Sequence, residues 1–102
     1  MKEIKRLSDR IKEEIADAKT YAEWALMDKD KRPEDAKRYF TISTQEMEHM
    51  KTLHDIVVEM IAEYRKLHGE PPSDMQAIYD YLHKEHIEAA GEVKALQMLF
   101  KE

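Results

Sequence analysis

The chain has 102 residues, a net charge of −5 and no cysteine. Its basic residues are interleaved with acidic ones, which argues against a nucleic-acid-binding protein that works through a basic face. The lack of cysteine excludes disulfides, thiolate metal sites and cysteine nucleophiles. Hydrophobic residues make up 42% of the chain and charged residues 38%, with only two glycines. This mixture is typical of long helices.

The apolar runs are far shorter than a membrane span, and the segment Met1-Lys2-Glu3-Ile4 is charged, unlike a signal peptide. We therefore expect a soluble, cytoplasmic protein with neither a membrane nor a nucleic acid as its partner.

The first predicted element is an amphipathic helix over about residues 2–28. Its apolar residues recur at steps of three and four, the spacing of one helix face. They are Ile4, Leu7, Ile11, Ile15, Ala18, Ala22 and Ala25. The charged run from Asp28 to Arg32 then predicts a solvated turn.

The second predicted helix covers about residues 33–68. Pro33 suits its first position, and Glu34 and Asp35 complement the positive end of the helix. Gly69 is a suitable stop, after which Pro71 and Pro72 prevent continuation. The inward stripe is predicted to be Ala36, Phe40, Ser43, Met47, Met50, Leu53, Val57, Ile61 and Tyr64.

The third predicted helix covers about residues 73–101, and Ser73 to Gln76 reads as a capping box at its start. Both breaks in the helical pattern are short, so consecutive helices should lie antiparallel. The sequence therefore predicts one all-α domain over residues 1–102, an antiparallel three-helix bundle.

Three polar residues interrupt the predicted buried faces. Glu14 lies between Ile11 and Ala18 on the first helix, and Glu46 and His49 lie on the inward side of the second. A buried carboxylate must be paired, hydrogen-bonded or metal-bound, because burying an isolated charge is costly. Glu46 and His49 are three residues apart, so one ion could accept both side chains.

The distances along the chain place these residues at one level of the bundle. Glu14 lies roughly 17 residues before the centre of the first turn. Glu46 and His49 lie roughly 15 and 18 residues after that centre. On the third helix Glu92 is the acid at the same height, ahead of Glu88 and Glu85. We therefore take Glu14, Glu46, His49 and Glu92 as candidate metal ligands. For Glu92 the alternative is an acid that flanks the core and pairs with a lysine.

At these residues the chain resembles the ferritin-like superfamily, and within it the rubrerythrin-type proteins. Glu14-x-x-x-Ala18-x-x-Tyr21-x-x-x-Ala25 is similar to the first metal-binding helix of that family. Ala36-x-x-x-Phe40-x-x-Ser43-x-x-Glu46-x-x-His49 is similar to the second. The resemblance covers about residues 11 to 57. It implies a di-iron or di-manganese carboxylate site in a ferritin-like bundle, with Glu14 and His49 as ligands and Glu46 as a possible bridge. The implied chemistry is oxidation of Fe(II) or reduction of peroxide.

The chain departs from the family pattern in one important respect. The full ligand set of that family is a single Glu from each of two helices and two Glu-x-x-His motifs from the others. Here there is one such motif on the buried faces, and Ala95 stands where a second histidine would follow Glu92. Either Glu92 completes a poorer site within one chain, or a second chain supplies the other half.

The second possibility agrees with the symmetry of most homo-oligomers. Extra apolar residues beside the main stripes also predict a homo-oligomer, as a dimer or an even-numbered assembly. These residues include Ile42, Ile56, Val58, Tyr81 and Met98. The alternative function is a metal-free helical oligomerisation or interaction module that retains a relic of the site.

The remaining histidines, His54, His68, His83 and His86, are predicted to be surface or boundary residues, although His86 falls on the apolar stripe of its helix. The residues predicted to fill the core are Tyr21, Trp24, Tyr39, Met27, Met47, Met50 and Met60. No sequence motif identifies a catalytic residue, so whether the protein is an enzyme stays open.

Overall fold

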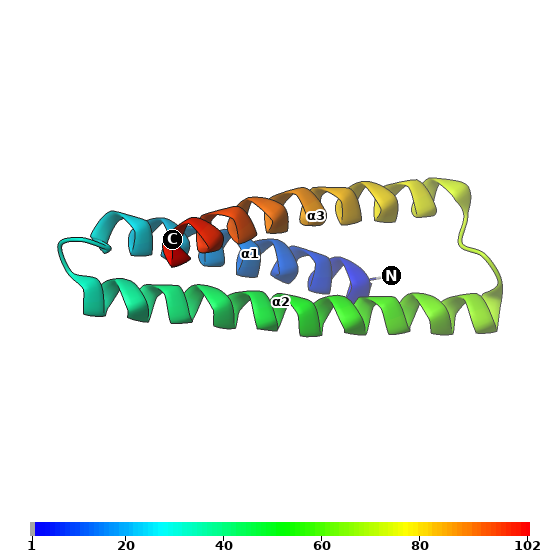
Figure 1. Cartoon of the computed structure of the whole chain (residues 1–102). Helices are drawn as coiled ribbons and strands as arrows, with labels where there is room; N and C mark the ends of the chain where they lie inside the picture. The colour runs from blue at the N-terminus through cyan, green and yellow to red at the C-terminus, as the bar shows by residue number, and fades with distance from the viewer. Residues whose placement is uncertain (1) are drawn as a thin grey trace.

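The computed structural model describes residues 2–102 and contains three long helices (Figure 1). These are α1 (Lys2–Asp28), α2 (Pro33–His68) and α3 (Ser73–Lys101), and no strand occurs in this range. The bounds agree with the ranges predicted from sequence. Pro33 occupies the start of α2, and Gly69 follows its last residue with a positive φ of 79°. Glycine adopts that backbone conformation without steric cost.

The start of α3 differs from the prediction. Ser73 is the first residue of the helix, and no side chain caps it. The Gln76 side chain instead accepts a hydrogen bond from Arg65 and donates one to Asp80, at 3.2 and 2.9 Å. The capping box was therefore wrong, because contacts with the end of α2 hold the glutamine that it needed.

α1 is the central helix and provides most of the buried side chains. It runs antiparallel to α2, while α3 packs mainly on α1 and touches α2 little (Figure 1). Only Ala36 and Ser43 of α2 and Val93 of α3 are fully buried. The main core cluster is Ile11, Ile15, Ala18 and Val93, with partly buried Met47, Met50, Leu53, Val57, Ala89 and Ala90 packed against it.

Small residues allow α1 and α2 to approach closely. Ala18 and Ala36 are completely buried, and so is Ser43. The Ser43 hydroxyl donates to the carbonyl oxygen of Ala18 at 2.7 Å and accepts from Gln97 Nε2 at 2.9 Å. One buried side chain thus connects all three helices.

The aromatic residues near the α1–α2 turn are more exposed than the sequence indicated. Tyr21, Trp24 and Tyr39 form a cluster in which Trp24 makes edge contacts at 5.4 and 5.6 Å. Trp24 is nevertheless 44% exposed and Met27 71% exposed. The prediction that these two residues fill the core was wrong, because α3 ends short of this turn (Figure 1). Among residues 2–102, no helix is long and apolar enough to cross a membrane.

Candidate metal centre

Glu14 is a charged residue in the buried face of α1. Its side chain is only 6% exposed. Arg10, one turn earlier, binds one of its oxygens: Nε and Nη2 lie 3.1 and 3.0 Å from Oε1. Arg10 also reaches Glu13 at 2.9 Å, so its guanidinium group neutralises both acids from the surface.

The other oxygen of Glu14 is the unusual atom. Oε2 is buried and, unless Glu46 is protonated, has no hydrogen-bond partner among residues 2–102. Its neighbour His49 places Nδ1 at 3.6 Å, too far for a good hydrogen bond. Buried polar atoms are nearly always satisfied in folded proteins. This orphan oxygen therefore needs either a proton on a neighbouring carboxyl group or a bound cation.

The structure brings Glu14, Glu46 and His49 together. One ligand atom from each lies within 4.8 Å of the others, and no other group in the described residues meets that condition. Glu14 is buried, Glu46 is half-buried, and the His49 side chain is 61% exposed. The group is thus shielded from solvent where Glu14 lies on α1 and accessible to solvent where His49 lies on α2.

The two carboxyl groups affect each other's protonation. With both ionised, neither could donate a hydrogen bond, and their charges would repel. A proton on Glu46 allows a hydrogen bond to Glu14, and this bond, together with burial, raises the pKa of Glu46 to about 7. The same hydrogen bond lowers the pKa of Glu14, and the charge of Arg10 lowers it further. The pair therefore holds one shared proton up to about pH 7.

These three residues fit a metal of the iron or manganese type. Two carboxylates and an imidazole form a mixed O/N ligand set that suits Fe(II) and Mn(II), and three protein ligands leave coordination positions open. The orphan Oε2 is available without breaking the Arg10 contact, which uses the other oxygen. The residues present therefore fit the group that the sequence implies.

Glu92 lies apart from this group. Its carboxylate pairs with Lys19 at 3.1 Å, and its side chain is 63% exposed. The structure thus brings three of the four predicted ligands together and leaves the fourth at the surface. Val93 explains the difference: it is fully buried and turns the preceding residue outward.

Sequence reasoning missed Arg10, which holds Glu14 in place. The signal was available, because Arg10 precedes Glu14 by four residues and such pairs meet on a helix surface.

No protein-family model, curated protein or solved structure matches the chain. The geometry of the residues themselves therefore carries the functional argument.

Proposed function

We propose that this chain is a ferritin-like di-metal carboxylate protein that holds iron or manganese and uses a second copy to complete its site. One observation carries the proposal: a buried oxygen of Glu14, with no partner unless Glu46 is protonated, lies with Glu46 and His49 within coordinating reach. The ferritin-like assignment itself rests on the sequence motifs of α1 and α2.

Counting ligands supports a shared site. A di-metal site of this class needs two single glutamates and two Glu-x-x-His motifs. One chain supplies Glu14 and the pair Glu46 and His49, which is half of that set. Glu92 adds nothing because it lies at the surface, paired with Lys19. Two copies of the α1–α2 hairpin would supply the complete set.

The open side of α2 carries a pattern suited to pairing with another helix. Residues along it recur at alternating steps of three and four, the heptad spacing of a coiled-coil seam. We call this row the α2 seam; its members are Tyr39, Ile42, Glu46, His49, Leu53, Ile56 and Met60. Apart from exposed His49, every member is half-buried. The seam is thus only partly covered by its own chain.

Glu46 and His49 stand in the middle of the α2 seam. If two copies pair antiparallel about a two-fold axis, their central residues meet at one level, within about two helical turns. The apolar ends of each seam would then pack against the other chain. This arrangement brings the two half-sites together and keeps water away from them.

A bound pair of iron ions would supply redox chemistry, either oxidation of Fe(II) by oxygen or reduction of peroxide. The chain's own residues would bind and orient the ions, with Arg10 fixing the carboxylate of Glu14 and the shared proton of Glu46 leaving as metal enters.

A metal-free interaction module is the second candidate, and one observation favours it. Arg10 and the shared proton already neutralise much of the charge on Glu14 and Glu46. The cluster could then serve only to fix how the helices pack.

Metal analysis separates the two candidates. Protein loaded anaerobically with Fe(II) or Mn(II) and then desalted should retain about one ion per chain, since two chains share two ions. Glu46→Ala should abolish retention, whereas Glu92→Ala, which changes an exposed acid, should not. No retained metal in the wild-type protein would support the interaction module. Oxygen consumption with Fe(II) then tests the oxidase activity, and a flat trace from metal-loaded protein would reject it.

A further inference from the structure

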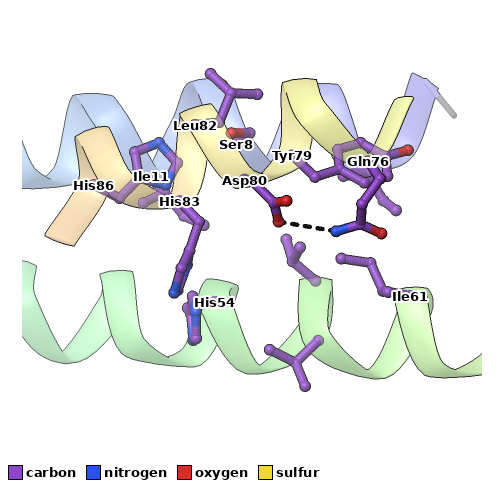
Figure 2. A pocket seen from close by; sticks show the side chains of 13 residues that line it. Ser8, Ile11, His54, Ile61, Gln76, Tyr79, Asp80, Leu82, His83 and His86 are labelled. Carbon is purple, nitrogen blue, oxygen red and sulfur yellow. Dashed lines mark hydrogen bonds between the residues drawn. The ribbon is translucent and has the colours of Figure 1, made fainter. Parts of the chain in front are cut away.

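Three histidines from α2 and α3 line shared cavities, away from the carboxylate group. His54 comes from α2, and His83 and His86 come from α3 (Figure 2). All three line a cavity of about 280 Å³ and also a shallower one on its other side, which reaches Met50 and Ala90. We call them the histidine cluster.

Two rings of the histidine cluster are in direct contact. His54 and His83 stack with centroids 5.2 Å apart and planes 24° from parallel. Figure 2 shows the His83 side chain reaching from α3 toward His54. His86 follows His83 by three residues and lines the same cavity, but it also lines a hollow beside Lys12, Ile15 and Ala16 of α1.

The charge state of the cluster suits ligation. Only a neutral imidazole can donate a lone pair to a metal. Burial lowers the pKa of His86, and the neighbouring His83 and His54 lower it further. Around the cluster, Lys12 and Lys51 disfavour added positive charge, while Asp55, Asp80 and Glu85 favour it.

We propose that His54, His83 and His86 form a second metal site, specific for a late divalent transition-metal ion such as Zn²⁺, Ni²⁺ or Cu²⁺. An all-imidazole ligand set suits these ions, whereas the carboxylate group suits iron and manganese. This site uses residues that the carboxylate site does not, so either can exist without the other.

Binding requires a local rearrangement of the side chains, because the three histidines do not bring one nitrogen each within 4.8 Å of the others as they stand. Stacked imidazoles present their faces to each other, whereas a metal ligand presents a nitrogen at the ring edge. The cavities on both sides of the stack give the rings room to rotate. The His54 side chain is 35% exposed, so its rotation displaces little packed structure.

The site would also have a structural effect. α3 packs mainly on α1 and touches α2 little. A metal held by His54 on one side and by His83 and His86 on the other would tie α2 to α3. Binding should therefore stabilise the folded chain.

Zn²⁺ titration of the Glu46→Ala variant tests the proposal, because that background lacks the carboxylate site. We expect about one Zn²⁺ per chain by calorimetry, a rise in melting temperature on binding, and its reversal by a chelator. His83→Gln and His54→Gln should each weaken Zn²⁺ binding by at least about tenfold. His68→Gln is the matched control, since His68 lies outside the cluster against Tyr64, and should bind Zn²⁺ normally.

Imidazole resonances in an NMR spectrum provide a readout that does not depend on the variants. On addition of Zn²⁺, the signals of His54, His83 and His86 should shift, while that of His68 stays in place. Absence of Zn²⁺ binding, or binding that neither His54→Gln nor His83→Gln weakens, would overturn the proposal. In that outcome the histidine cluster only packs α3 against α2.

Discussion

The chemistry of the candidate centre depends on one oxygen atom. Arg10 binds Oε1 of Glu14 and leaves Oε2 buried, with a protonated Glu46 as the one donor available to it. A proton on Glu46 removes the charge repulsion between the two carboxylates, and the pKa of Glu46 is raised to about 7. A divalent ion would do the same more completely, because it would bind both carboxylates and release that proton.

This shared proton predicts an unusual pH dependence for the metal-free protein. Between its ordinary pKa near 4.5 and the folded value of about 7, Glu46 binds more proton in the folded chain than in the unfolded chain. Its contribution to stability is therefore complete below pH 4.5 and is lost as the pH rises through 7. Glu14, whose pKa is lowered, acts in the opposite direction at more acidic pH. We expect the urea midpoint of metal-free protein to fall between pH 5 and pH 8.

Glu46→Gln isolates this effect, because the amide cannot ionise. The urea midpoint of this variant should fall much less between pH 5 and pH 8, and the variant should be more stable than wild type at pH 8. Glu48→Gln, at an exposed position of the same helix, is the control and should keep the decline. An unchanged pH profile in Glu46→Gln would show that the carboxyl pair does not share a proton.

At the scale of the elements, Ser43 connects the three helices. Its hydroxyl joins the Ala18 carbonyl on α1 to Gln97 on α3 and is fully buried. Ser43→Ala removes both hydrogen bonds and should destabilise the protein by about 1–3 kcal/mol in urea unfolding. Thr41→Ala removes an exposed hydroxyl bonded within its own helix, and its effect should stay within about 0.5 kcal/mol. Equal effects of the two substitutions would show that Ser43 is not a central contact.

The helices could be predicted from sequence because their signals are local. Pro33 starts α2, Gly69 adopts a positive φ after it, and apolar residues repeat at helical spacing. The α1–α2 hairpin brought Glu14, Glu46 and His49 to one level for the same reason. The number of residues between the turn and each side chain, at a fixed rise per residue, determines that level.

The features that escaped prediction depend on tertiary packing. Counting residues gave the height of Glu92 but not its direction, which depends on Val93 turning into the core. The meeting of His54 with His83 depends on how α3 lies across the hairpin. The capping box at Ser73 failed because Arg65 of α2 engages Gln76.

The whole molecule is an elongated rod rather than a closed bundle. It measures 55 × 19 × 18 Å, with a radius of gyration of 16.4 Å. A globular chain of about 100 residues has a radius of roughly 13 Å. Large apolar side chains stay exposed on α2 and α3, among them Val58, Ile78, Tyr81, Ile87 and Met98. Exposed apolar surface of this extent supports the proposed assembly.

Substitution in the α2 seam tests that assembly. Ile56 belongs to the seam and is half-buried, so Ile56→Asp should place a charge in the proposed interface and convert a dimer or larger assembly to monomer in light scattering. It should also lower metal retention, because the half-sites would separate. Ala62→Asp adds the same charge at an exposed position of α2 off the seam and should preserve both the assembly and the metal retention. A wild-type monomer at micromolar concentration would contradict the shared site.

Native mass spectrometry of protein loaded anaerobically with Mn(II) tests the central claim most directly, because it reports assembly and metal content in the same ion. The proposed site predicts metal only in dimers or larger even-numbered assemblies, with about two ions for every two chains. Glu14→Ala, Glu46→Ala and His49→Ala should each remove this metal, whereas Glu92→Ala should leave it. Metal-free assemblies after loading, or ions carried equally well by monomers, would contradict a site built from two copies of Glu14, Glu46 and His49.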